Sequence, residues 1–112
     1  MLKLTREERA WLNDYRKAIE GKHPGVVHEM LIYGSKGRGQ AHAESDLDVL
    51  LMMITNEAGS LKKKLRRIGY LLAATSNVLP SILAYTQEEW ESRRKNRSSF
   101  RQAVERDAVR VV

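Results

Sequence analysis

LIYGSKGRGQAHAESDLDVLLMM, from Leu31 to Met53, is the stretch around which this chain is organised. An apolar run ends at Tyr33, a polar and glycine-rich loop follows from Gly34, and a second apolar run begins after Asp46-Leu47-Asp48. Short apolar runs bounded by glycine or polar residues are typical of buried strands. The stretch therefore predicts two buried strands joined by a loop, with Gly-Ser after the first and Asp-x-Asp at the start of the second.

The flanking sequence predicts helices and a third strand. Thr5 followed by Glu8 indicates a capping box that opens a helix running to about Glu20, with Gly21 as its stop. The apolar VLLMMI at 49–54 predicts a central strand covered on both faces. Ser60 is the expected N-cap of the basic helix that follows. The remaining expected elements are a helix at 61–75, a strand at 81–85, helices at 86–94 and 100–106, and an edge strand at 109–112. This alternation indicates an α/β domain.

Length and composition set outer bounds on the class of protein. With 112 residues and 42% hydrophobic content, the chain has room for one domain, residues 1–112, around a modest core. Its apolar runs are shorter than the roughly 20 residues that span a bilayer, and the charged N-terminus does not resemble a signal peptide. The absence of cysteine excludes a disulfide framework and a thiolate metal site. We expect a cytoplasmic protein that does not associate with membranes.

The net charge of +6 is unevenly distributed. Residues 26–60 carry two basic and five acidic side chains, whereas residues 61–112 carry twelve basic and five acidic ones. An acidic centre in a basic chain fits a cation site that faces a polyanionic substrate, although a solvated basic surface is the plainer interpretation. The basic segment Lys62–Arg67 has three interpretations: a solvated helix face, a surface for an acidic protein partner, or a surface that binds nucleic acid. Aromatic residues are not interleaved with it, so a stacking platform for single strands is unsupported.

Asp46 and Asp48 are the candidate metal ligands and catalytic residues. Side chains two apart in a strand point to the same side, so both carboxylates are presented together. Two neighbouring carboxylates repel each other, and a divalent cation relieves that repulsion. Oxygen ligands without cysteine or suitably spaced histidine favour Mg²⁺ or Mn²⁺ over Zn²⁺.

The loop that begins at Gly34 is the candidate phosphate-binding segment. Gly34 follows a buried strand and lets the backbone approach a phosphate closely, and the Ser35 hydroxyl can donate to a phosphate oxygen. Lys36 and Arg38 add positive charge to the same loop. His42 also lies there, with a solvated loop histidine as the plainer interpretation.

YGSKGRGQAHAESDLDVLL, residues 33–51, resembles the signature of the minimal nucleotidyltransferases of the DNA polymerase β-like nucleotidyltransferase superfamily. The resemblance implies a polymerase β palm-like α+β fold, with a small mixed sheet of about four strands flanked by helices. It implies that Gly34, Ser35, Lys36 and Arg38 hold ATP or another NTP, and that Asp46 and Asp48 bind Mg²⁺. It also implies transfer of a nucleoside monophosphate to a protein or nucleic-acid hydroxyl. Many such proteins are antitoxins paired with a HEPN-type toxin, which the resemblance makes a candidate partner here.

One position departs from the pattern of that family. A third carboxylate usually stands on the next strand, about five residues before a Thr-x-Glu-Glu turn, and counting back from Thr86 reaches Ser81. The third carboxylate helps to activate the attacking hydroxyl in two-metal phosphoryl transfer. The sequence thus leaves two hypotheses: an active Mg²⁺-dependent nucleotidyltransferase, or a catalytically weak nucleotide-binding module that neutralises a partner by contact.

Overall fold

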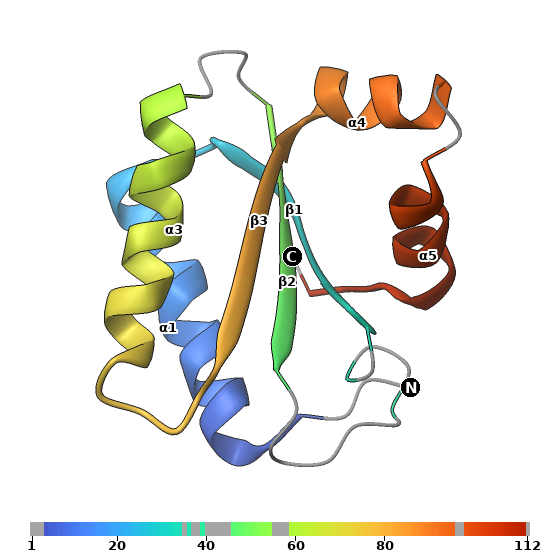
Figure 1. The fold of residues 1–112 in the computed structure, drawn as a ribbon. Coiled ribbons are helices and arrows are strands. Elements are labelled where there is room, and N and C mark those ends of the chain that lie inside the picture. The colour runs from blue at the N-terminus through green and yellow to red at the C-terminus, as the bar shows by residue number, and fades with distance from the viewer. Residues whose placement is uncertain are drawn as a thin grey trace.

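The computed structural model describes residues 4–34, 36, 39, 46–54, 59–95 and 98–111. This part of the chain contains both helices and strands (Figure 1). In chain order they are α1 (Arg6–Lys22), β1 (Val27–Tyr33), β2 (Leu47–Met53), α3 (Gly59–Ala73), β3 (Pro80–Thr86), α4 (Gln87–Lys95), α5 (Ser99–Asp107) and β4 (Val109–Arg110).

The strands form a mixed four-stranded sheet in the order β3-β2-β1-β4. β1 pairs with β2 and with β4 in antiparallel orientation, whereas β2 pairs with β3 in parallel. The predicted α+β architecture with a small mixed sheet is therefore confirmed. The central position of β2 is confirmed as well, and it explains why all but one of its residues are buried.

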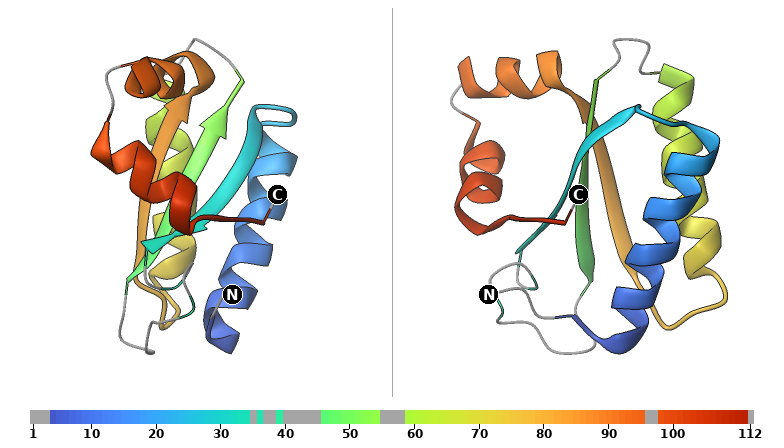
Figure 2. Two further views of the ribbon diagram at one scale, coloured as in Figure 1. Left: turned by 90° about the vertical axis from the view of Figure 1, so that its right-hand side faces the viewer. Right: turned by 180° about the vertical axis from the view of Figure 1, so that it is seen from behind.

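Helices cover both faces of the sheet (Figures 1 and 2). On one face, α1 and α3 bury Trp11, Tyr15 and Leu65 against the side chains of Ile32 and Val49. The opposite face carries α4 and α5, and this smaller cluster contains Leu50, Met52, Trp90 and Val104. Alternate residues of β2 contribute to the two clusters, which is the strand periodicity expected for a sheet covered on both sides.

The first helix is opened by the predicted capping box. The Thr5 side chain accepts a hydrogen bond from the Glu8 amide (3.1 Å), and the Glu8 carboxylate accepts one from the Thr5 amide (2.8 Å). The predicted stop at Gly21 is wrong, because α1 continues to Lys22 and is capped by His23. The turn is made at Gly25, whose φ of +75° lies in the left-handed region that favours glycine.

Two further boundaries differ from the prediction. Ser60 was expected to cap α3, but the helix begins at Gly59 and places Ser60 in its first turn. This helix ends at Ala73 rather than Thr75. Within the described part of the chain, no helix is both long and apolar enough to cross a membrane.

Candidate functional site

Asp46 and Asp48 stand where β2 begins, beside the end of β1. Asp48 is the register partner of Tyr33 on β1 and of Ser81 on β3. Leu50 and Met52 pack on the α4–α5 face, so the alternation of side chains along β2 directs Asp48 to that face as well. The ends of β1, β2 and β3 that carry these residues lie away from α4, which occupies the other end of the sheet (Figure 1). Asp48 is consequently half-buried and Asp46 is exposed.

Gly34 brings the backbone into contact with the Asp48 carboxylate. Its φ is +68°, and a Cβ built at this position would collide with Asp48 Oδ2 and lie 3.4 Å from Asp48 Cγ. Only glycine satisfies both the left-handed backbone and the close approach. The sequence predicted glycine here so that a phosphate could approach the backbone closely. The group that the structure places on this side is the Asp48 carboxylate, and the phosphate contact stays a prediction. Gly34 and Asp48, one residue from each half of the motif, are thus brought together by the pairing of β1 with β2.

The surroundings of Asp48 and Tyr33 disfavour the ionised form of both side chains. Burial and then the negative charge of Asp46 raise the pKa of Asp48 above its ordinary value. Burial, followed by the charge of Asp48, raises the pKa of the neighbouring Tyr33 hydroxyl to about 12. Tyr33 therefore remains a neutral hydrogen-bonding group beside the carboxylates at physiological pH. The sequence prediction did not include Tyr33, although its position directly before Gly34 places it next to the Asp-x-Asp strand.

Tyr33, Asp48 and Ser81 lie next to one another on β1, β2 and β3, and Ser81 is the third residue of this row across the sheet. It pairs with Asp48, and it shares a face with Leu83 and Tyr85, which contribute to the cluster on the α4–α5 side. The residue that the sequence placed opposite the carboxylate pair is therefore next to it in space. Among the described residues there is no group of three or more histidine, cysteine, aspartate and glutamate side chains arranged to hold a metal ion.

Lys36 does not lie where a phosphate ligand would be expected. Its ammonium group is 2.7 Å from Glu8 Oε2 and donates a hydrogen bond of 2.8 Å to Glu8 Oε1, and both side chains are almost fully buried. Glu8 is the same residue that closes the capping box of α1. The sequence prediction missed this pairing because 28 residues separate the two side chains. Lys36 is thus held at the start of α1, and this placement argues against a direct phosphate contact.

The other predicted phosphate ligands, Ser35 and Arg38, lie outside the described residues, as does His42. Their assignments remain predictions. The described part of the candidate site consists of Tyr33, Gly34, Asp46, Asp48 and Ser81.

The basic segment of α3 divides between two surfaces. Lys62 Nζ lies 2.7 Å from Glu89 Oε1 and 5.9 Å from the centroid of the Tyr85 ring, which places it toward α4. Lys64 and Arg67 instead line a groove on the side of α1. The segment that reads as one basic run in sequence therefore has two different structural environments.

Comparison with protein-family models finds no match, and a search of curated proteins finds no significant relative. Among solved structures, the chain is similar to a crystal structure of a protein from Sulfolobus solfataricus that is provisionally described as a nucleotidyltransferase. The two sequences are 19% identical, and the alignment covers 98% of this chain and 89% of that one, with a TM-score of 0.49. At this level of similarity the likeness concerns the course of the backbone and carries no information about chemistry.

Proposed function

We propose that this protein binds a nucleoside triphosphate with Mg²⁺ or Mn²⁺ and transfers the nucleoside monophosphate to a hydroxyl group of a protein or nucleic acid. The observation that carries the proposal is the contact between the Gly34 turn and the Asp48 carboxylate across paired strands. It joins a backbone turn suited to phosphate with a pair of carboxylates suited to a hard cation.

The donor set fits a magnesium ion. Asp46 and Asp48 would supply two oxygen ligands. Burial and then the negative charge of Asp46 raise the pKa of Asp48, and a bound cation would offset the repulsion between the two carboxylates. Mg²⁺ commonly uses one or two protein carboxylates and completes its shell with water and substrate phosphates. The metal would neutralise charge on the transferring phosphate, and the absence of a side chain at Gly34 leaves room for the Asp48 carboxylate that would hold this metal.

A second candidate function rests on Ser81. This side chain stands beside Asp48, at the position where a third carboxylate would complete a two-metal site. A serine hydroxyl is neutral at physiological pH and is a poor base, so activation of the acceptor hydroxyl would be weak. The alternative is therefore a binding module that holds Mg²⁺ and nucleotide but neutralises its partner by contact.

Thermal unfolding with Mg²⁺ and each NTP tests the nucleotide site. A ligand at about 100 times its Kd stabilises the folded state by about 2.7 kcal/mol, which raises the Tm of a domain of this size by roughly 10 °C. We expect a Tm rise that requires both Mg²⁺ and nucleotide and is lost in Asp46→Ala/Asp48→Ala. If no NTP raises the Tm, the nucleotide site is refuted for both candidate functions.

Transfer is tested with α-labelled ATP and the other NTPs, Mg²⁺ or Mn²⁺, and candidate acceptors. The acceptors are a HEPN-type toxin encoded beside this protein, if one is present, and RNA. Label that becomes covalently attached and depends on Asp46 and Asp48 supports the enzyme. Nucleotide binding without transfer supports the binding module.

A further inference from the structure

A groove with a cavity volume of ≈ 450 Å³ runs along the outer surface of α1 and α3, on the opposite face of the sheet from Asp48. Figure 2 shows these two helices side by side against the sheet. The α3 side chains that line it form two stripes at a spacing of four residues, one with Lys64, Ile68 and Leu72 and one with Arg67 and Leu71, and Thr75 lines it just beyond the end of the helix. From residue 64 to residue 72 the helix rises about 12 Å, which equals about two turns of a partner helix.

The floor of the groove is apolar and accessible. Leu71 is 60% exposed although it is a large hydrophobic residue, and the half-buried Ile68 and Leu72 lie one turn or less from it. A single exposed leucine needs no explanation, but three apolar side chains gathered in one groove form a surface that can bury an apolar stripe.

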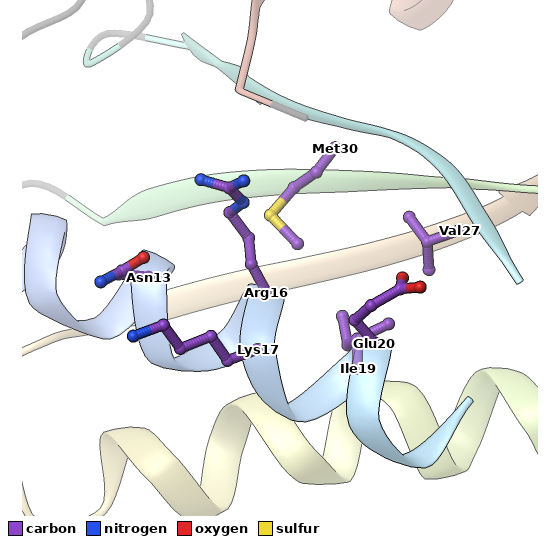
Figure 3. Close-up of a pocket in the computed structure, with 7 residues that line it drawn as sticks. All are labelled: Asn13, Arg16, Lys17, Ile19, Glu20, Val27 and Met30. Atoms are coloured by element: carbon purple, nitrogen blue, oxygen red, sulfur yellow. The ribbon is translucent and has the colours of Figure 1, made fainter. Parts of the chain in front are cut away.

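The charge of the groove has one sign. Lys22 of α1 and Lys64 and Arg67 of α3 line it, and no aspartate or glutamate is among the lining residues. A second cavity, of ≈ 410 Å³ between α1 and β1, offers a contrast, because the Glu20 carboxylate lines it together with Arg16 and Lys17 (Figure 3). The cavity between α1 and β1 thus has lining charges of both signs, whereas the charged side chains of the α1–α3 groove favour a negatively charged partner.

We propose that the α1–α3 groove binds an acidic amphipathic helix of a partner protein. Apolar residues of that helix, spaced three and four apart, would pack on Ile68, Leu71 and Leu72. Its flanking carboxylates would pair with Lys22, Lys64 and Arg67. Among the described residues that line the groove there is no phenylalanine, tyrosine or tryptophan, so bases of a nucleic acid would lack the large rings of a stacking platform.

The test uses a fluorescently labelled synthetic peptide of about three to four helical turns, with leucines on one face and glutamates on the others, measured by anisotropy. One control peptide has the same composition with its leucines distributed around the helix, and another carries lysine in place of glutamate. We expect saturable binding of the first peptide only. Absence of saturable binding, or equal binding of all three peptides, overturns the proposal.

Variants locate the binding surface. Leu71→Asp and the double variant Lys64→Glu/Arg67→Glu each weaken binding of the acidic peptide by at least about tenfold, and the charge reversal raises affinity for the lysine peptide. The matched controls are Leu79→Asp, at an equally exposed leucine outside the groove, and Lys17→Glu, at an exposed lysine on another side of α1. Both controls leave binding within about twofold of wild type, and circular dichroism confirms that every variant is folded.

Other occupants give distinct results. If the groove variants abolish binding of a single-stranded RNA oligonucleotide or of anionic phospholipid vesicles and leave peptide binding unchanged, the proposed partner is wrong. The same conclusion follows if sedimentation shows a wild-type dimer that Leu71→Asp dissociates, because the occupant is then a second copy of this chain. Peptide binding is measured without nucleotide, so its result is independent of the nucleotidyltransferase proposal.

Discussion

Replacing Gly34 by alanine perturbs a contact that joins the two halves of the candidate site. A non-glycine residue in the left-handed region costs about 1–2 kcal/mol, and the backbone at Gly34 has a φ of +68°. The new Cβ also collides with Asp48 Oδ2, so the carboxylate must turn away from its preferred rotamer, which costs about 0.5–1.5 kcal/mol more. We expect Gly34→Ala to lower the free energy of unfolding by about 2–3 kcal/mol.

Gly25→Ala is the matched control for this substitution. Gly25 has a similar φ of +75°, but no atom lies within 4 Å of a Cβ built there, so only the backbone strain remains. We therefore expect Gly25→Ala to cost about 1–2 kcal/mol. The additional loss of unfolding free energy in Gly34→Ala, relative to Gly25→Ala, measures the effect of the contact with Asp48.

Urea denaturation of both variants, alone and combined with Asp48→Ala, measures this excess as a coupling free energy. In the Asp48→Ala background, Gly34→Ala should cost no more than Gly25→Ala. Equal losses for the two glycine variants in the wild-type background would refute the reasoning, and so would an excess that persists without Asp48. The Mg²⁺-dependent stabilisation by NTP should be lost in Gly34→Ala and retained in Gly25→Ala.

Three other predictions concern the carboxylates and the lysines. Lys36→Met leaves Glu8 buried without its cation and should destabilise the protein by about 3–5 kcal/mol. Lys62→Met removes the partner of Glu89 in a pair with the same separation of 2.7 Å, in which the Lys62 side chain is 18% and the Glu89 side chain 46% exposed. This variant should cost about 1 kcal/mol or less, so similar urea midpoints for Lys36→Met and Lys62→Met would contradict the interpretation. Because the pKa of Asp48 is raised in the folded state, ionisation costs stability at pH values above that of an unfolded aspartate. Asp48→Asn should therefore raise the Tm at pH 7, with a gain that shrinks toward pH 4, and a lowered Tm at pH 7 would count against this assignment. Ser81→Asp adds a carboxylate beside Asp48 and should tighten Mg²⁺ binding severalfold in isothermal titration. An unchanged Mg²⁺ affinity would show that positions 48 and 81 do not form one metal site.

The sequence was sufficient for the parts of the fold that depend on local patterns. The capping box of Thr5 and Glu8 was predicted correctly because its residues are neighbours along one helix turn. The buried central strand that begins at Leu47 was predicted correctly because it is apolar at consecutive positions. Helix ends at Gly21 and Ser60 were misplaced, since a glycine or serine near a boundary permits an end without fixing it.

The candidate site was predictable in composition and only partly in arrangement. Asp46 and Asp48 share a face by strand periodicity, which any extended segment would provide. Their approach to Gly34 and Ser81 depends on the antiparallel pairing of β1 with β2 and the parallel register of β2 with β3. Register is set by packing over the whole sheet, so the sequence suggested this proximity through a family resemblance and could not establish it.

Lysine residues mark the limit of what the sequence alone determined. Their number and the basic character of α3 are properties of the sequence, but the surroundings of Lys36, Lys62 and Lys64 are set by other parts of the fold. Lys36 is bound by Glu8 in the interior, Lys62 by Glu89 at the surface, and Lys64 lines the groove beside α1. A long, flexible cationic side chain takes its role from the carboxylates and apolar surfaces within its reach. Those neighbours are brought together only by tertiary structure.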